Sequence, residues 1–380
     1  MKFTIITPSF NQLPYLKRCV ASVRDQVSDR GVGCDVLGVK PRVSSDLNPK
    51  AENFPPQADL PGAEKPNTKN LTHRLTEPFA VHHHIQDGGS TDGTVDWLEC
   101  YANEVREQGF RHEALGVRES NPDAQCLAPS AQLSGYSFSY ASEPDNGMYD
   151  ALNKGISFAL QKQFPDNRQL TAVNCDDEII AWLNCDEQYL PGALQRAARF
   201  FEAHPEADFV YGDVLMVDPE GALLTYRKNP PLRRAYVQAD HLYTQSAAMF
   251  FRAVIFLSGT RFNPVWKAVG DCDFVVRTLA NGFRPAQIKD YIAVCTMTGE
   301  NLSRRSAGVD ELLTFRRTVP LLFRAGRPLF NVLRYFEKFL RGGYRQAMPL
   351  EYELCTDDSA VRKKNISETA SSRFRWDDHE

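Results

Sequence analysis

The sequence predicts an α/β protein with a mostly parallel sheet and helices on both faces of that sheet. Before residue 190, short apolar runs alternate with segments whose apolar residues recur at helical spacing, in three strand–loop–helix units followed by a fourth strand. Such alternation is typical of parallel strands joined by crossover helices. Because ligands bind beyond the carboxyl ends of parallel strands, we expect the functional residues at that edge.

The two halves of the chain differ in their pattern. In the first half, strands are expected at 3–7, 81–86, 136–141 and 179–183, with helices beginning near 13, 95 and 148. In the second half, two apolar runs flank an Asp-Pro-Glu-Gly turn and predict a hairpin of 209–217 and 222–226. A strand at 246–251 and a helix from about 270 to 280 follow. We expect this second half to hold the acceptor side.

Three segments are more polar than the rest of the chain. Residues 28–78 and 119–134 are rich in polar residues and Pro, and predict disordered or loosely packed insertions. We therefore expect a domain over 1–300 that contains both insertions, a C-terminal helical region over 301–354 and a polar tail over 355–380.

The charge, the cysteine pattern and the apolar stretches of the chain limit the classes of function and location that fit it. A formal net charge of -4 over 380 residues gives no general basic field, which excludes typical nucleic-acid binders and favours a small phosphorylated ligand. The nine cysteines form no CxxC pair, which is typical of a reducing compartment. No secretory signal and no spanning apolar stretch is visible, so we expect a cytoplasmic protein.

Asp87 follows the second predicted strand and is succeeded by Gly88-Gly89-Ser90. The small residues allow a ligand to approach closely, and the carboxylate is suited to accept a hydrogen bond from a nucleobase N–H. A turn in which Ser90 or Asp92 caps the next helix explains the same residues. The two roles are compatible.

Asp186 and Glu187 follow the fourth predicted strand. At this edge a carboxylate can hold a hard divalent cation against a diphosphate. The similar string 174–178 precedes the strand, so it is expected in a loop at the opposite edge. Taken alone, Asp186-Glu187 would indicate a surface turn, but its place after the strand favours the functional interpretation.

Asp271 and Asp273 stand in the predicted first turn of a helix. The helix dipole favours the ionised form of a carboxylate there, and an ionised carboxylate can act as a general base. Simple helix capping accounts for the same pattern.

Five segments, taken in order, resemble the motifs of family 2 glycosyltransferases with the GT-A fold. They are 7–11 (TPSFN), 86–94 (QDGGSTDGT), 142–155 (SEPDNGMYDALNKG), 182–192 (WLNCDEQYLPG) and 270–277 (GDCDFVVR). The resemblance covers about residues 1–300 without the insertions. It implies a GT-A nucleotide-binding sheet and an inverting, metal-assisted enzyme.

The resemblance also implies roles for individual residues. The nucleotide-binding residues would be Pro8, Phe10, Asn11, Asp87, Asp145 and Asn153, with Phe10 and Asp87 on the uracil and its ribose. Asp186 and Glu187 would form the metal site for Mg²⁺ or Mn²⁺, and Asp271 would be the catalytic base. The implied reaction moves a hexosyl or N-acetylhexosaminyl group from a UDP-sugar to a glycan or lipid-linked acceptor, as in polysaccharide biosynthesis.

Two residues depart from the family pattern. Glu187 stands where the family usually has Asp, and this either changes the metal geometry or serves to orient Asp186. Gly270 stands where an acidic residue usually precedes the base. Neither change removes a required carboxylate.

Two other functions fit parts of the pattern. Another nucleotide-sugar or nucleotidyl enzyme on a related sheet would leave Asp271 without a role. A non-catalytic module that binds a nucleotide-sugar or a glycan would not need Asp87, Asp186 and Asp271 together.

Residues 309–345 combine many apolar residues with Arg and Lys and contain few acids. An apolar face with a basic flank is suited to peripheral contact with an anionic membrane. The alternative is a pair of helices, broken at Pro320 or at 326–328, that pack on the catalytic domain. The number of apolar residues favours this second interpretation, because they would need burial in a core.

Overall fold

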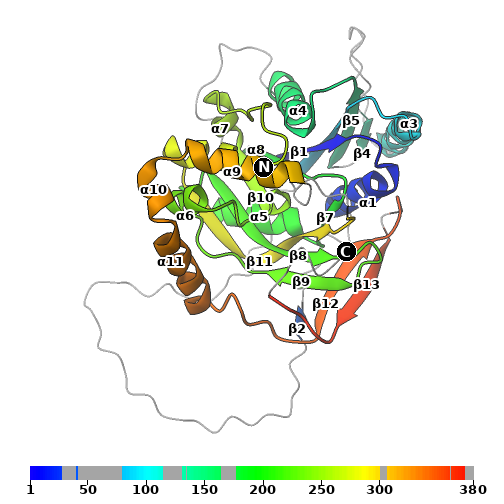
Figure 1. Cartoon of the computed structure of the whole chain (residues 1–380). Coiled ribbons are helices and arrows are strands. Elements are labelled where there is room, and N and C mark those ends of the chain that lie inside the picture. Colours follow the sequence, from blue (N-terminus) through cyan, green and yellow to red (C-terminus); the bar gives the residue numbers. More distant parts are fainter. Residues whose placement is uncertain are drawn as a thin grey trace.

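The computed structural model describes residues 1–27, 40–41, 79–113, 131–133, 135–163, 177–299, 306–359 and 361–372. In this part of the chain a ten-stranded sheet has the order β4-β5-β3-β1-β6-β10-β8-β11-β7, with β9 paired to β8 (Figure 1). The predicted insertions 28–78 and 119–134 lie outside the described residues, apart from β2 (Lys40–Pro41) and β4 (Ala131–Leu133).

The predicted strand and helix units of the first half are confirmed. They are β1 (Lys2–Ser9), α1 (Leu13–Arg24), β3 (Ala80–Asp87), α3 (Thr94–Glu113), β5 (Tyr136–Ser142), α4 (Met148–Gln163) and β6 (Glu178–Trp182). The structure adds two elements that were not predicted, β7 (Glu187–Tyr189) and α5 (Ala193–Ala203). Strands β5, β3, β1 and β6 are neighbours and are all parallel.

Both faces of the sheet carry a core, as expected for a doubly covered sheet. Ile5 belongs to a buried cluster with residues of α1, α3 and α5, whereas Ile6 belongs to a second cluster with residues of α4 and α8 (Gly270–Ala280). Successive side chains of a strand point to opposite faces, so β1 contributes to both clusters. The mostly parallel α/β fold with helices on both faces is therefore confirmed.

The second half adds shorter, largely antiparallel pairings to this sheet. The elements are β8 (Phe209–Val217), β9 (Leu223–Arg227), α6 (Arg234–Ala239), β10 (Met249–Arg252), α7 (Ala253–Leu257) and β11 (Pro285–Thr296). Strand β11 runs parallel to β8, and β8 and β9 form the predicted hairpin.

The strand predicted from residue 246 begins later, at Met249. Residues Ser246–Ala248 form a 3-10 turn, in which the Ala248 N–H donates to the Gln245 carbonyl at 3.1 Å. Their small side chains let the backbone turn inside a fully buried region, and apolar content alone does not reveal this.

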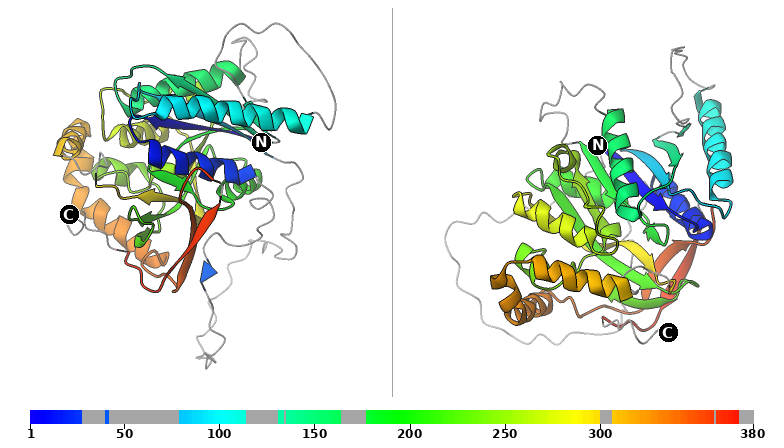
Figure 2. Two further views of the ribbon diagram at one scale, coloured as in Figure 1. Left: turned by 90° about the vertical axis from the view of Figure 1, so that its right-hand side faces the viewer. Right: turned by 45° about the horizontal axis from the view of Figure 1, so that its top comes forward.

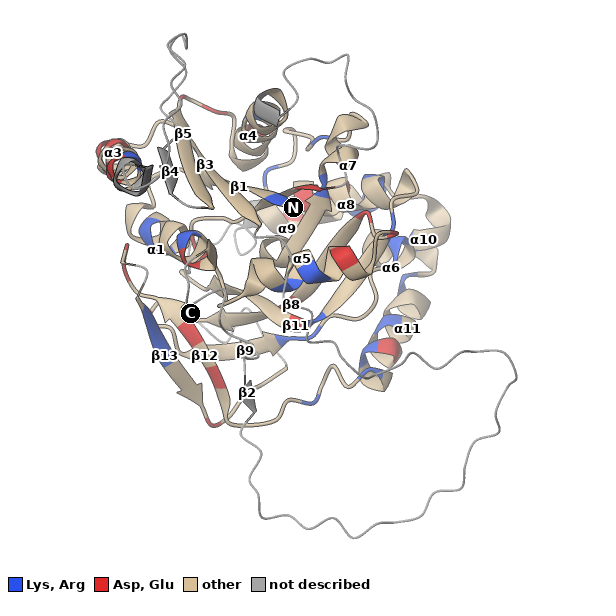
Figure 3. Cartoon of the chain, turned by 180° about the vertical axis from the view of Figure 1, so that it is seen from behind, with Lys and Arg blue, Asp and Glu red and all other residues tan. Residues whose placement is uncertain are grey.

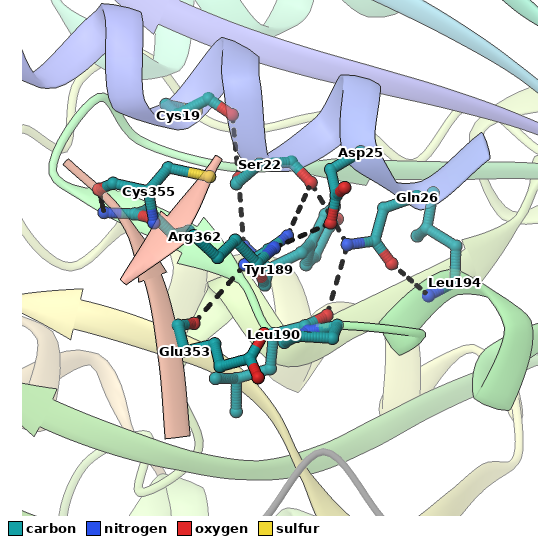
Figure 4. Close-up of polar contacts among 12 residues, drawn as sticks. Cys19, Ser22, Asp25, Gln26, Tyr189, Leu190, Leu194, Glu353, Cys355 and Arg362 are labelled. Carbon is teal, nitrogen blue, oxygen red and sulfur yellow. Dashed lines mark hydrogen bonds and ion pairs between the residues drawn. The ribbon is translucent and has the colours of Figure 1, made fainter. Parts of the chain in front are cut away.

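The predicted polar tail contains a strand. Strand β13 (Arg362–Ser367) pairs with β12 (Leu350–Cys355), which in turn pairs with β2. Figure 4 shows the buried contact that fixes this second sheet: the Arg362 guanidinium donates to Asp25 Oδ2 at 2.7 Å and to the Tyr189 carbonyl at 2.9 Å. One arginine of this polar segment thus reaches the 3-10 turn after α1 (Asp25–Val27) and β7.

Three helices follow the sheet, α9 (Ser306–Thr318), α10 (Leu321–Ala325) and α11 (Arg327–Leu340), and the last two lie at the margin of the molecule (Figures 1 and 2). Phe315 and Val319 are buried in the second core cluster. Among the described residues, no helix has the length and the apolar character needed to cross a bilayer.

Candidate active site

The register of the parallel strands brings the predicted site loops to one edge of the sheet. Ser9, at the end of β1, is level with Asp87 of β3, and Asp87 is level with Ser142 of β5. Ile6 is level with Trp182, so the turn after β6 starts at the same edge. The loops that begin at residues 10, 88, 143 and 183 are therefore neighbours.

Asp87 organises its own loop. Its carboxylate is fully buried and accepts hydrogen bonds from the Gly89 and Ser90 N–H groups at 3.0 and 2.9 Å. The hydroxyls of Ser90 and Ser142 donate to the same carboxylate at 2.5 and 2.7 Å. Asp87 therefore ties the β3 loop to the end of β5. The predicted capping is made by Asp92, whose Oδ1 accepts the Thr94 N–H at 3.1 Å at the start of α3.

Asn11 ties the β1 loop to the β3 loop. It has a positive φ of 52°, a conformation that asparagine tolerates better than most residues. Its N–H donates to Ser90 Oγ at 2.8 Å, and its Oδ1 accepts the Thr91 N–H at 2.8 Å. Asp92 adds a bond from the Leu13 N–H at 3.0 Å. The two loops therefore form one unit.

Phe10 projects from this unit with 61% of its surface exposed. A Cβ on Gly88 would lie 2.6 Å from Asp145 Oδ2 and 3.4 Å from the Phe10 ring. The lack of a side chain at Gly88 thus brings an exposed aromatic ring and a carboxylate together from two loops. A flat ring at the mouth of a sheet edge is suited to stacking on a planar base.

The other residues predicted to bind nucleotide have partners within the protein. Asp145 Oδ1 accepts the Gly147 N–H at 2.7 Å. Both ends of the Asn153 side chain bond the backbone of Phe262, at 2.9 and 3.0 Å. Asn153 therefore joins α4 to the loop before α8, while the Pro8 carbonyl accepts the Cys185 thiol at 3.3 Å.

Asp186 and Glu187 point to different surroundings. Asp186 is partly exposed in the turn after β6, and its carbonyl accepts the Thr296 N–H at 2.8 Å. Glu187 is 5% exposed, and its Oε2 accepts the Asn184 N–H at 2.8 Å. Burial, and next the charge of Asp186, raise the pKa of Glu187 well above its usual range. The geometry favours a role for Glu187 in shaping the turn that presents Asp186.

Asp271 lies in the first turn of α8. Its Oδ1 accepts the Cys272 N–H at 2.7 Å and the Tyr149 hydroxyl at 3.4 Å. Removal from water raises the pKa of Asp271 to about 6, against the lowering effect of these two hydrogen bonds. Asp273 forms an ion pair with Arg277 instead, at 2.8 Å.

Gly270 explains how Tyr149 reaches Asp271. A Cβ at this position would lie 2.6 to 2.8 Å from three atoms of the Tyr149 ring. The glycine that departs from the family pattern thus makes room for the ring beside the start of α8.

Sequence reasoning missed three residues that support this region. Tyr149 stands within a recognised motif, but its type alone gave no role. The Lys267 ammonium donates to the Asn146 carbonyl and so joins two loops of the site. Glu311, on α9, accepts the N–H groups of Lys267, Ala268 and Val269 at 2.8, 2.7 and 3.3 Å. Glu311 is one of the few acidic residues in 309–345, and this is the only feature of the sequence that could have drawn attention to it.

The described residues contain no group of three or more His, Cys, Asp or Glu side chains that could hold a metal ion by themselves. Mg²⁺ is commonly held by one or two carboxylates together with substrate phosphates. Asp186, presented by a turn at the ligand edge, fits that arrangement.

No protein-family model matches the chain. In sequence, the chain is 24% identical over 249 residues to PGL/p-HBAD biosynthesis glycosyltransferases of Mycobacterium tuberculosis and Mycobacterium bovis, covering 66% of this chain and 76% of each relative.

Among solved structures, TarS 1–349 of S. aureus in complex with UDP-GlcNAc aligns with a TM-score of 0.49 and 15% identity, covering 90% of this chain and 73% of that chain. The mannosyltransferase PcManGT from Pyrobaculum calidifontis in complex with GDP-Man and Mn²⁺ aligns with a TM-score of 0.39 and 14% identity, covering 91% and 65%.

The class of enzyme follows from the sequence relatives: the chain is a glycosyltransferase.

Proposed function

We propose that the chain transfers a hexosyl or N-acetylhexosaminyl group from a UDP-sugar to an acceptor hydroxyl, with inversion at the anomeric carbon, as a member of family 2 with the GT-A fold. The observation that carries this proposal is Asp271, a carboxyl group of raised pKa at the start of α8. Tyr149 of α4 donates to it, and Lys267 contacts the loop after β5, whose Asp145 lies beside Gly88 and Phe10 of the joined β1 and β3 loops.

Asp271 acts as the general base. Its pKa of about 6 leaves it ionised near neutral pH, yet makes it a stronger proton acceptor than an ordinary aspartate. It takes the proton of the acceptor hydroxyl while the oxygen attacks the anomeric carbon from the face opposite the nucleotide. The Tyr149 hydroxyl, at 3.4 Å from Asp271 Oδ1, holds the carboxylate in place before the proton arrives.

The nucleotide is bound at the joined loops. The exposed Phe10 ring stacks on the uracil, and Asp145 beside it faces the same space. Asp87 and Asn11 shape this surface through their bonds to the 88–91 loop. At its two sides, Asn153 bonds the backbone of Phe262, and the Pro8 carbonyl accepts the Cys185 thiol. For Asp87 to bond the base, one of the hydrogen bonds that its carboxylate now accepts must break.

Asp186 would hold the divalent cation, Mg²⁺ or Mn²⁺, together with the donor diphosphate, while Glu187 supports the turn. When bound, the cation supplies positive charge that stabilises the diphosphate leaving group. The acceptor we propose is a glycan or a lipid-linked glycan, bound on the side of the second half of the chain.

A screen of UDP- and GDP-sugars for release of the nucleotide tests the proposal, with and without Mn²⁺ and with Asp186→Ala as comparison. We expect release from one UDP-sugar, dependent on the cation and lost in Asp186→Ala. If a nucleotide-sugar binds but no release occurs with any glycan acceptor, the chain is a binding module and the proposed reaction is wrong.

A further inference from the structure

Helices α10 and α11 present an apolar surface to solvent. Its main residues are 56% to 74% exposed: Leu321, Leu322, Leu329, Val332, Phe336 and Leu340. The last four follow one another at intervals of three or four residues, so they form a single stripe along α11. We call these six residues the apolar face. An apolar surface that is contiguous in this way usually marks a site of interaction.

The opposite side of α11 is polar and faces the protein. The side chain of Arg334 is 4% exposed and donates to Asp240 Oδ2 at 3.0 Å. Arg327 and Arg316 donate to Oδ1 of the same aspartate, each at 2.8 Å. Glu337 pairs with Arg233 at 2.6 Å. The charged side of α11 therefore faces the protein, whereas an amphipathic helix that packs on a core turns its apolar side inward.

Asp240 fixes this orientation. Although burial opposes its ionisation, His241, Arg334 and Arg316 hold the pKa of Asp240 below its usual range. Turning α11 to bury the apolar face would break these ion pairs and leave charges without partners in a buried place. The helices are broken near Pro320 and at Gly326, as the packing interpretation predicts, and Phe315, Val319, Phe323 and Phe330 pack on the second core cluster. The other side of α10 and α11 is not covered by the protein, and the apolar face lies there.

The charge around the apolar face is positive. Residues 312–349 contain eight Arg or Lys and one acidic residue, Glu337. Figure 3 shows the basic positions of α11 with a single acidic one between them. Arg317, Arg324, Arg341 and Arg345 are exposed. An apolar face with a basic flank is complementary to the surface of an anionic bilayer.

We infer that the apolar face and its exposed arginines dock on an anionic lipid bilayer without crossing it. A second copy of the chain is a poorer partner, because a two-fold interface through α11 would bring the same arginines of both copies together. No helix in the described part of the chain could span the bilayer, so the contact is peripheral. The inference is independent of the proposed reaction, because it concerns a different surface.

Sedimentation of the full-length protein with vesicles tests the inference. Vesicles of equimolar phosphatidylcholine and phosphatidylglycerol are compared with phosphatidylcholine alone. We expect binding to the anionic vesicles that weakens as salt is added. The triple variant Val332→Ser, Phe336→Ser, Leu340→Ser should bind at least about tenfold more weakly, because it removes most of the inserted apolar surface.

Charge and fold are tested separately. Arg324→Gln and Arg341→Gln should each weaken anionic binding about fivefold. The matched control Val361→Ser, Ile366→Ser changes two exposed apolar residues near and on β13, and it should bind like the parent chain. Because the substituted residues on α11 are exposed, the circular dichroism and melting temperature of the triple variant should match those of the parent.

Two results would overturn the inference. One is absence of vesicle binding by the parent chain at low salt. The other is a parent chain that is dimeric by sedimentation velocity and becomes monomeric in the triple variant while vesicle binding stays unchanged, which would assign the apolar face to a second copy.

Discussion

The sheet edge and the C-terminal helices differ in where they place their charged and apolar side chains. At the edge, carboxylates and amides are held by hydrogen bonds within the protein, and the loops that carry them are open to solvent, the Phe10 ring among them. On α11, the charged side is inside, at Asp240, and the apolar side is outside. The first arrangement fits the polar ligand that we propose, whereas the second fits the bilayer surface that we infer.

This comparison shows what buried charge does in the two regions. Asp271 is half-buried and has one tyrosine hydroxyl and one backbone N–H as partners, so partial removal from water raises its pKa and it is suited to accept a proton. Asp240 is held with three arginines and a histidine, so it stays ionised and acts as an anchor. The number of cationic partners separates the reactive carboxylate from the structural one.

Asp240→Ala should have the largest effect, on stability. It leaves Arg334 buried without its partner, so we expect a loss of about 3 kcal/mol in the free energy of unfolding. This value is near the lower end for a broken buried ion pair, because Arg327, another partner of Asp240, is 43% exposed. Urea denaturation followed by circular dichroism measures this. The control Asp358→Ala breaks an exposed pair with Lys17 and should cost less than about 1 kcal/mol. Equal losses in the two variants would remove the anchoring role of Asp240.

Asp271→Asn should lower turnover by on the order of 100-fold or more, with donor binding nearly unchanged, because it removes the base and keeps its size. Steady-state transfer and calorimetric donor binding measure the two effects. Asp273→Asn is the matched control, since Asp273 is paired with Arg277 and should change turnover little. Near-normal turnover in Asp271→Asn, with a loss in Asp273→Asn, would move the base to Asp273.

The pH dependence of kcat/KM should have an acid limb near 6. Burial raises the pKa of Asp271 to about 6, so the carboxylate is protonated as the pH falls through that value and can no longer accept a proton. Below it, kcat/KM should fall about tenfold per pH unit. A limb at the value of an ordinary aspartate would show that the base is exposed to water in the working enzyme.

Tyr149→Phe should have the smallest effect on rate, less than about tenfold at a pH above the limb, since it removes one long hydrogen bond. That bond lowers the pKa of Asp271, so the acid limb of the variant should move to higher pH. Gly270→Ala places a Cβ within 2.6 Å of the same ring and should move the limb in the same direction. The control Tyr335→Phe, on the exposed side of α11, should leave the acid limb at the same pH. If the limb is also unchanged in Tyr149→Phe, Tyr149 contributes only packing.

The order of strands and helices and the edge that gathers the functional groups were determined by the sequence itself. Period-two and helical spacings are local properties, so the strands that end at Asp87 and before Asp186 could be predicted within a residue or two. The helix that carries Asp271 could be predicted for the same reason.

Only the tertiary structure decided which partners the side chains take. The Asn153 amide bonds the backbone of Phe262, 109 residues away, and Arg362 reaches Asp25 across 337 residues. No local pattern specifies such contacts. The spacing of apolar residues in α11 predicts that one side of the helix is apolar, but it does not say which side faces the protein. Asp240 and its arginines decide that, because turning the helix over would separate a buried charge from its partners.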